Sequence, residues 1–259
     1  RATDAFEAAR RRVARFVNAA PQEIVFTRGT TEAVNLVAQT YGLRHVGRGD
    51  AVLVSHMEHH SNIVPWQLLC ERVGAELLVI PIDDRGVLDL DALDRLLVPR
   101  VKLLGLVHAS NALGTVIDVR TVADRAHAAG AEVFLDCVHF APHGRIDVQA
   151  FDCDYLVCSG YKAFGPHMGF LWGRRELLRR LPTFREDFIA DEPPGKIEAG
   201  TLPFENIAGM EAAVGYLADI GRGCGGTGDC AAGVALRAEV AAGMQAILDC
   251  EQGLSLELL

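Results

Sequence analysis

The chain has 259 residues, long enough for one α/β domain with a substantial hydrophobic core. Half of its residues are hydrophobic, yet no run of about 18 apolar residues appears, so the sequence argues against a membrane span. The net charge of −9 gives no electrostatic reason to expect a nucleic-acid partner.

The first 17 residues have the pattern of an amphipathic helix. Apolar side chains recur on one side and arginines on the other, and we expect the arginines to form a solvated face. The side chains expected to face inward are Phe6, Val13, Phe16 and Val17, and those expected to lie largely outward are Arg10, Arg11, Arg12 and Arg15.

Beyond this helix, short β-rich runs alternate with helical patterns along the chain. The predicted strands cover residues 23–27, 51–55, 76–80, 102–107, 132–136, 155–158 and 169–172. The predicted helices cover residues 31–41, 65–73, 90–97, 119–129, 174–181, 205–220 and 231–250. This alternation predicts an α/β fold in which a mainly parallel sheet is flanked by helices.

The sequence Phe-Thr-Arg-Gly-Thr-Thr-Glu at residues 26–32 joins the first predicted strand to a helix. A Gly-Thr-Thr turn at a helix N-terminus offers free backbone N–H groups and the positive end of the helix dipole. With the hydroxyls of Thr30 and Thr31, these groups suit a phosphate. The alternative is an ordinary N-cap, in which Thr30 or Thr31 satisfies the first helical turn.

Residues 56–62, His-Met-Glu-His-His-Ser-Asn, combine three histidines with a glutamate and therefore suggest a metal site. Their spacing differs from His-Glu-x-x-His, and Pro65 restricts helix formation at that point, so we predict no metal there. A histidine that stacks on an aromatic cofactor is the better functional interpretation of this loop.

Two polar residues follow or end predicted strands. Asn111 lies in Ser-Asn-Ala-Leu-Gly-Thr at residues 110–115, and Asp136 ends the run Val-Phe-Leu-Asp. Open α/β sheets bind ligands beyond the carboxyl ends of their strands, where both residues are expected. Asn111 could hydrogen-bond the phenolic oxygen of a cofactor, or it could serve as a turn residue beside Gly114.

Asp136 and Lys162 form the most informative pair in the sequence. They lie 26 residues apart, and Lys162 ends Ser-Gly-Tyr-Lys after another predicted strand. A lysine amine can form a Schiff base with the aldehyde of pyridoxal phosphate, and a carboxylate can keep its ring nitrogen protonated. Asp and Lys are common surface residues, so the pair gains its weight from the surrounding motifs.

Together these motifs resemble a known family. The order Thr-Arg-Gly-Thr-Thr-Glu-Ala-x-Asn, Met-Glu-His-His-x-Asn-x-x-Pro-Trp, Ser-Asn-x-Leu-Gly-Thr, strand-Asp, Ser-Gly-x-Lys and Glu-Ala-Gly-Thr is similar to that of the class V aminotransferase superfamily, which are fold type I pyridoxal-phosphate enzymes. Within it, the chain resembles the cysteine desulfurase and selenocysteine lyase branch. The similarity runs from about residue 2 to residue 217.

The resemblance implies roles for individual residues. Lys162 would be the Schiff-base lysine, Asp136 would pair with the pyridine nitrogen, His59 would stack on the ring and Asn111 would meet its phenolic oxygen. The implied phosphate contacts are Thr30, Thr31 and Ser159, with Thr201 reaching the phosphate of a partner subunit. The family therefore implies a homodimer, an amino-acid substrate such as L-cysteine, and a possible sulfur-acceptor protein.

Two residues depart from the family pattern. His139 stands where the family usually has Gln, and Tyr161 stands where it usually has His. Both can still donate hydrogen bonds, so we predict that both contact the cofactor. They leave several functions open: cysteine desulfuration as the leading hypothesis, then an aminotransferase or a C–S lyase acting on another amino acid, and a non-catalytic scaffold that retains the fold.

The resemblance also implies a domain division. Residues 1–221 would form the large cofactor domain without the family's N-terminal segment, and residues 222–259 would form a loop and helix leading toward a small C-terminal domain. That small domain carries the family's nucleophilic cysteine. We therefore interpret the chain as a fragment, and complete turnover by it alone is not expected.

The sequence has seven cysteines, most of them in apolar runs. Reduced core thiols in a cytoplasmic protein are the expectation for such a set. The exception is the Gly-rich stretch from Cys224 to Cys230, which could expose a thiol but does not match the family's nucleophile loop by position.

Overall fold

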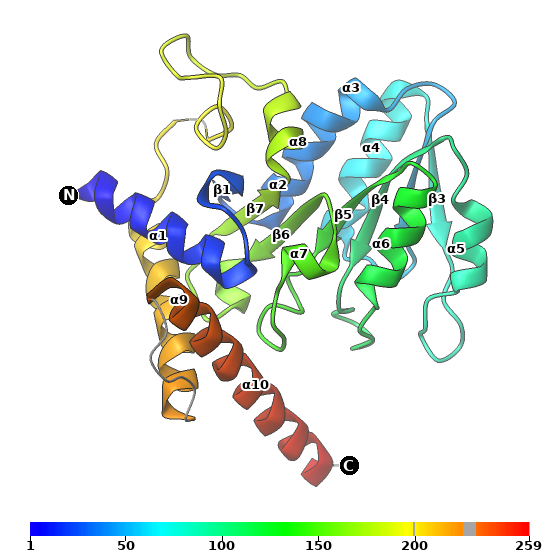
Figure 1. Ribbon diagram of the computed structural model, residues 1–259. Coiled ribbons are helices and arrows are strands. Elements are labelled where there is room, and N and C mark those ends of the chain that lie inside the picture. The colour runs from blue at the N-terminus through cyan, green and yellow to red at the C-terminus, as the bar shows by residue number, and fades with distance from the viewer. Residues whose placement is uncertain (199, 225–231, 259) are drawn as a thin grey trace.

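The computed structural model describes residues 1–198, 200–224 and 232–258 (Figure 1). In these residues, seven strands form one sheet that runs through the middle of the molecule. The strands are β1 (Ile24–Thr27), β2 (Ala51–Ser55), β3 (Glu76–Ile80), β4 (Val101–Val107), β5 (Glu132–Asp136), β6 (Tyr155–Ser159) and β7 (Gly169–Gly173). Each predicted strand is present, with bounds that agree to within one residue at either end.

The sheet is mainly parallel, as predicted. Its order is β1-β7-β6-β5-β4-β2-β3, and the strands from β6 through β3 pair in parallel. Only β7 runs the other way, antiparallel to both β6 and β1. The last residues of β4 and β5, Val107 and Asp136, are paired with each other, so the carboxyl ends of the central strands meet at one edge.

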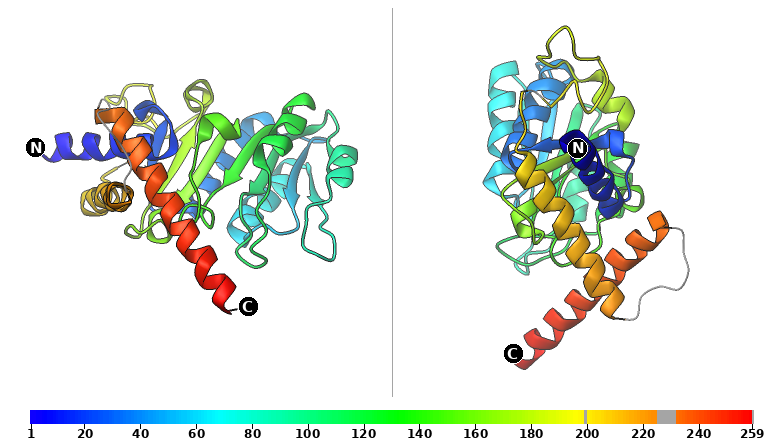
Figure 2. Two further views of the ribbon diagram at one scale, coloured as in Figure 1. Left: turned by 60° about the horizontal axis from the view of Figure 1, so that its bottom comes forward. Right: turned by 90° about the vertical axis from the view of Figure 1, so that its left-hand side faces the viewer.

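Helices cover both faces of the sheet (Figures 1 and 2). One face packs against α2, α4 and α8, and the other belongs to a core that also contains residues of α1, α5, α6, α7, α9 and α10. The helices are α1 (Ala2–Val17), α2 (Thr30–Val37), α3 (Leu43–His45), α4 (Val64–Val73), α5 (Leu90–Leu96), α6 (Val119–Ala128), α7 (Val148–Phe151), α8 (Arg175–Arg180), α9 (Phe204–Gly223) and α10 (Ala232–Leu258). The arrangement is the helix-flanked α/β fold that the alternating pattern predicts.

At one end of the sheet, α1, α9 and α10 pack together (Figure 2). α9 and α10 approach closely because each contributes a glycine: a Cβ on Gly221 would overlap the carbonyl of Glu239, and one on Gly243 would overlap the carbonyl of Leu217. α10 then projects beyond the body of the molecule (Figure 1). The predicted domain limit at residue 221 falls in the last turn of α9 and stays a prediction.

One prediction for α1 is wrong. Arg10 was expected to lie largely outward, but its side chain is buried. The guanidinium bonds both carboxylate oxygens of Glu198, at 2.7 and 2.8 Å, donates to the Ile24 carbonyl at 2.7 Å and lies over the ring of Phe26. These contacts offset the cost of removing the charge from water. The other inward and outward predictions for α1 agree with the structure, Arg12 being half-buried.

The described cysteines divide as the apolar runs suggest. Cys70, Cys137, Cys153 and Cys158 are buried free thiols, whereas Cys224 and Cys250 are exposed. Cys230 and most of the Gly-rich stretch lie outside the described residues. Within the part of the chain that the structure describes, none of the helices combines the length and apolarity needed to cross a membrane.

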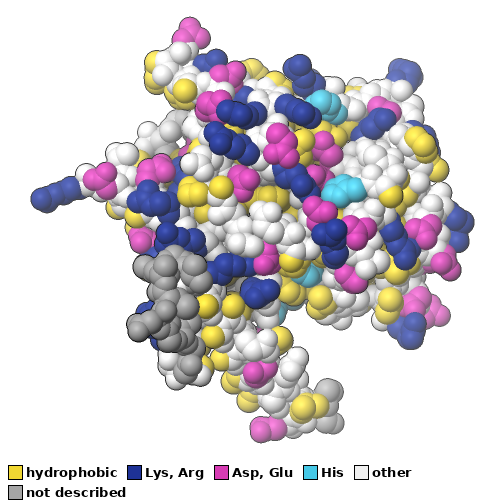
Figure 3. Space-filling model, viewed as in Figure 1, with side chains coloured by type: hydrophobic (Ala, Val, Ile, Leu, Met, Phe, Trp, Pro, Cys, Tyr) yellow, Lys and Arg dark blue, Asp and Glu magenta, His cyan; other side chains and the backbone are white. Residues whose placement is uncertain are grey.

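Charged side chains of both signs are interspersed over the face of the molecule seen in Figure 3. Hydrophobic side chains gather instead along the projecting part of α10, where Leu254, Leu256 and Leu258 are exposed. The face seen in Figure 3 therefore has no broad patch of positive or of negative charge.

Candidate active site

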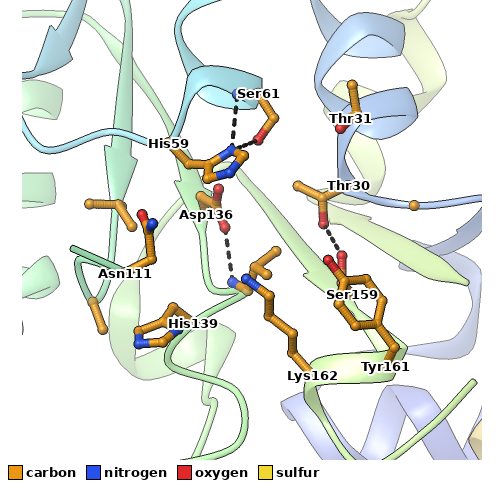
Figure 4. Close-up of a pocket in the computed structure, with 14 residues that line it drawn as sticks. Thr30, Thr31, His59, Ser61, Asn111, Asp136, His139, Ser159, Tyr161 and Lys162 are labelled. Carbon is orange, nitrogen blue, oxygen red and sulfur yellow. Dashed lines mark hydrogen bonds between the residues drawn. The ribbon is translucent and has the colours of Figure 1, made fainter. Parts of the chain in front are cut away.

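A cavity of about 150 Å³ opens at the carboxyl edge of the sheet. Nine of the ten predicted site residues line it, although they come from five separate segments (Figure 4). They are Thr30, Thr31, His59, Asn111, Asp136, His139, Ser159, Tyr161 and Lys162. The parallel strands bring them together because each strand ends at this edge and the residues that follow it line the cavity.

Asp136 is the last residue of β5 and lies at the base of the cavity. Its side chain is 3% exposed, and Oδ1 accepts a hydrogen bond from the Val138 amide at 2.9 Å. Burial raises the pKa of Asp136, while that hydrogen bond and the nearby His59 and Lys162 act in the opposite direction. A buried carboxylate with so little protein hydrogen bonding is well suited to a cationic partner, such as a protonated ring nitrogen.

Lys162 ends the short 3₁₀ turn η4 (Gly160–Lys162) that follows β6. Its side chain extends into the cavity toward Asp136 (Figure 4). Within the described ranges, no hydrogen bond or ion pair engages its amine. The turn depends on Gly160, because a Cβ there would lie 2.7 Å from the Pro166 carbonyl oxygen. The fold therefore holds an uncommitted amine beside a buried carboxylate.

Hydroxyl groups line the side of the cavity at the start of α2. Thr30 Oγ1 and Ser159 Oγ are 2.8 Å apart and share a hydrogen bond (Figure 4). The residue at the N-cap is Gly29, so the alternative that Thr30 or Thr31 caps the helix is wrong. Gly29 packs closely against β7, where a Cβ on Gly169 would lie 2.8 Å from the Gly29 Cα. The hydroxyls and free amides of the first turn are thus left for an anion.

His59 lies above Asp136, just before the 3₁₀ turn η3 (His60–Asn62) (Figure 4). Its Nδ1 accepts the backbone N–H of Ser61 at 3.1 Å and lies 2.8 Å from the Ser61 hydroxyl. A neutral His59 therefore carries its proton on Nε2. Ser61 also lines the cavity but was missed from the sequence, although a serine two residues beyond a histidine in a turn is a recognisable local hydrogen-bonding pattern.

The histidine-rich loop does not converge on a common point. Glu58 is buried and points into the sheet, whereas His59 faces the cavity. Across residues 1–198, 200–224 and 232–258, no group of three or more His, Cys, Asp or Glu side chains is arranged to hold a metal ion.

Asn111 and His139 lie on the opposite side of the cavity from Thr30 and Ser159 (Figure 4). Asn111 lies in the loop after β4. Burial lowers the pKa of His139, and the neighbouring His143 and Lys162 lower it further. His139 is thus a neutral imidazole near pH 7, able to donate and to accept a hydrogen bond.

Tyr161 lies at the mouth of the cavity, 49% exposed, and stacks on His167 with ring centroids 4.9 Å apart. Thr201 is the one predicted site residue that does not line the cavity. It is exposed and lines a separate surface hollow that also contains Arg28 and His167. Its predicted role at the site of a partner subunit stays a prediction.

The fold described above is found in class V aminotransferases. Residues 1–223 match the family model described as "Aminotransferase class-V". The chain belongs to this family.

Similar proteins narrow the branch. Proteins named cysteine desulfurase from Klebsiella pneumoniae and Synechococcus elongatus are 43% and 44% identical to this chain over 85% of its length. The structure resembles the cysteine desulfurase CsdA from Escherichia coli, with a TM-score of 0.80 and 37% identity over 84% of this chain. It resembles an apo cysteine desulfurase from Thermococcus onnurineus equally well, with a TM-score of 0.80 and 35% identity over 86% of this chain.

The chain is shorter than these proteins. It spans 58% of the Klebsiella protein and 37% of the Synechococcus protein. It likewise covers 58% of each of the two solved chains.

Proposed function

We propose that this chain is the cofactor-binding part of a pyridoxal-phosphate-dependent cysteine desulfurase. The observation that carries the proposal is the convergence of Lys162, Asp136 and His59 in one cavity beside the paired hydroxyls of Thr30 and Ser159. Relatives named cysteine desulfurase support the reaction and the substrate, L-cysteine.

The donors and acceptors around the cavity fit this cofactor. When bound, pyridoxal phosphate supplies an electron sink for negative charge at the α-carbon of an amino acid. Asp136 would hold the ring nitrogen, and Lys162 would hold the aldehyde carbon. His59 would cover the ring face, and Asn111 and His139 would reach the phenolic oxygen. The remaining contacts, to the phosphate, would come from Thr30, Thr31, Ser159 and Tyr161.

Lys162 would also act as a base. Its free amine would take the α-proton of the substrate and return it later in the reaction. Asp136 supports this step because a negative charge kept beside the ring nitrogen favours the protonated ring. His59, whose Nδ1 accepts from the Ser61 amide, would contribute a ring of fixed orientation.

Desulfuration requires a thiol that accepts the sulfur: cysteine plus a thiol gives alanine plus a persulfide, so no separate oxidant is consumed. None of the described cysteines lines the cavity. The accepting thiol would therefore come from outside the described part of this chain. An aminotransferase or a C–S lyase would use the same cavity residues but would release a keto acid or pyruvate instead of alanine.

The proposal extends to the assembly and its surroundings. Thr201 would contact the phosphate bound in a partner subunit, which makes the working form a homodimer. A sulfur-acceptor protein would take the persulfide sulfur, and the buried free thiols are in keeping with the reducing cytoplasm.

The test is an absorbance titration of the purified chain with pyridoxal phosphate, followed by borohydride reduction. The sequence has only three lysines, Lys102, Lys162 and Lys196, so mass mapping of the reduced adduct identifies the attachment site without ambiguity. We expect a visible band and an adduct on Lys162, both lost in Lys162→Ala. Lys102→Ala is the matched control, since Lys102 lies at the start of β4, away from the cavity.

Absence of the band in folded wild-type chain would instead support the scaffold hypothesis.

If the band is present, incubation of the loaded chain with L-cysteine and a small thiol separates the candidate reactions. Alanine with persulfide supports desulfuration, whereas pyruvate supports a C–S lyase.

A further inference from the structure

Glu58 lies directly before His59, but its side chain points away from the cavity. The residue is 8% exposed, and its carboxyl group has three hydrogen-bond partners. Oε1 contacts the Ser55 hydroxyl and accepts the Val107 amide at 2.8 Å, and Oε2 accepts from Asn62 Nδ2 at 2.7 Å. One side chain thus ties the end of β2, the end of β4 and the turn η3 together.

The partners fix which way every group in this network faces. Trp66 Nε1 can only donate, and it donates to Asn62 Oδ1 at 2.9 Å. The amide group of Asn62 must therefore present its NH₂ to Glu58, so Oε2 must accept. The Val107 N–H is likewise only a donor, so Oε1 must accept as well. A carboxyl group is the side chain that meets both demands at this place.

The network also fits closely against the sheet. Asn62 and Trp66 are fully buried, and a Cβ on Gly105 of β4 would lie 3.1 Å from Trp66 Nε1 and 3.4 Å from Asn62 Oδ1. The side chains of this loop therefore alternate in direction. Those of residues 58 and 62 are buried against the sheet, and those of residues 59 and 61 face the cavity. The backbone N–H of Asn62 donates to the His59 carbonyl at 2.8 Å. This bond closes the turn that separates the side chains facing the sheet from those facing the cavity.

We propose that Glu58 is a positioning residue that fixes His59 over the cofactor site by holding Asn62 on one side and the Val107 amide on the other. The idea that His59 covers a cofactor rests on the proposed function. The positioning of the imidazole itself is a property of the chain alone.

The protonation of Glu58 is compatible with this role. Burial raises its pKa to about 8, and the nearby Asp136 also acts to raise it. A proton on Glu58 has one suitable place, the bond between Oε1 and the Ser55 hydroxyl, because the other partners are donors. The two accepting bonds that hold Asn62 and Val107 are therefore kept whether Glu58 is neutral or charged.

The test exchanges the carboxyl and amide groups of Glu58 and Asn62. Glu58→Gln alone places an NH₂ group against a donor, either Asn62 or Val107, and so leaves a buried donor unsatisfied. We expect its affinity for pyridoxal phosphate to fall about tenfold. In the double variant Glu58→Gln/Asn62→Asp the amide at position 58 can donate to the carboxylate at position 62, which still accepts from Trp66. We expect affinity within about threefold of wild type.

Nitrogen NMR of His59 in the cofactor-free chain provides the second readout, with His59→Gln identifying its signals. In the wild type and the double variant we expect a single tautomer with the proton on Nε2, and in Glu58→Gln a mixture of tautomers. Asp154→Asn, which removes a buried carboxylate at the opposite edge of the sheet, controls for general destabilisation and is expected to change neither readout.

A Glu58→Gln chain with wild-type cofactor affinity and an unchanged His59 tautomer would overturn the positioning role, as would a double variant that is no better than Glu58→Gln in both readouts. If the wild type binds no pyridoxal phosphate while the His59 tautomer responds as expected, the proposed function fails and the positioning role stands.

Discussion

The two edges of the sheet both bury carboxyl groups, but they use them differently. At the amino edge, Asp154 accepts hydrogen bonds from the Val133 amide at 2.7 Å and from His127 at 2.8 Å, and it forms an ion pair with Arg174 at 2.9 Å. At the carboxyl edge, Asp136 accepts a single hydrogen bond from the described residues, that of the Val138 amide, and faces a cavity with Lys162. The hydrogen-bonding and ion-pairing capacity of Asp154 is thus taken up by protein groups, whereas Asp136 has capacity left for a ligand.

Perturbed ionisation alone would not separate these edges. Burial raises the pKa of Glu132 at the amino edge to about 7, much as it raises that of Glu58 at the carboxyl edge to about 8. Unspent hydrogen-bonding capacity alone would not separate the edges either, because Glu132 Oε2 and the Tyr155 hydroxyl at the amino edge are buried without a partner among the described residues. What distinguishes the functional edge is that its unspent groups face an open cavity. A raised carboxyl pKa is therefore a guide to burial, and unspent capacity that faces an open cavity is the guide to function.

The largest effect is expected from Asp136→Asn. The substitution removes the charge that would face the ring nitrogen in a buried site, so we expect the affinity for pyridoxal phosphate to fall by about a hundredfold or more. Absorbance titration measures it. Asp154→Asn is the matched variant at the amino edge and should bind the cofactor as the wild type does. Equal losses in the two variants would erase the distinction between the edges.

Stability should show the reverse order. Asp154→Asn leaves Arg174 and His127 facing a neutral amide in a buried position, and we expect the free energy of unfolding to fall by about 3 kcal/mol. Asp136→Asn should cost the cofactor-free chain far less, or even stabilise it, because burial penalises the charge that it removes. Urea unfolding of both cofactor-free variants gives the comparison, which fails if Asp136→Asn is the more destabilising.

Much of this layout could be predicted from the sequence. The bounds of β2, β3 and β5 match the predicted ranges, and the polar residue at the end of a buried strand locates Asp136 correctly. These signals are local, because strand periodicity and strand ends are written in consecutive residues. The length of α10 was underestimated: the helix ends at Leu258, eight residues beyond the predicted end.

The misses depend on contacts between distant segments or on very short elements. Arg10 is buried because Glu198, 188 residues away, receives it, and no helical pattern encodes that pairing. The four-residue helix α7 is too short to show a period, although Asp147 caps it recognisably. The importance of Glu58 becomes visible only when Val107 of β4 is placed beside it.

A pH-dependent effect of intermediate size is expected at the amino edge. The hydrogen bond to Asp154 is the main cause that raises the pKa of His127 in the folded chain. A raised folded pKa means that the added stability is fully present below the unfolded value of about 6.5 and is lost as pH rises through the folded value. We expect His127→Ala to cost about 1 kcal/mol at pH 6 and clearly less at pH 9, measured by urea unfolding. An equal cost at both pH values would show that the charged form of His127 adds nothing.

The smallest effect concerns two hydroxyl groups, one at each edge. Tyr155 is fully buried, and its hydroxyl has no hydrogen-bond partner among the described residues, so Tyr155→Phe should leave the free energy of unfolding unchanged or raise it by up to about 1 kcal/mol. Thr30→Val removes the hydroxyl that is paired with Ser159 in the cavity, and we expect pyridoxal-phosphate affinity to fall about threefold. Measuring both quantities for both variants sharpens the contrast, since Tyr155→Phe should not alter affinity. If Tyr155→Phe weakened cofactor binding as much as Thr30→Val does, an unpartnered hydroxyl at the amino edge would matter to the site, and an open cavity would no longer mark the groups that bind the cofactor.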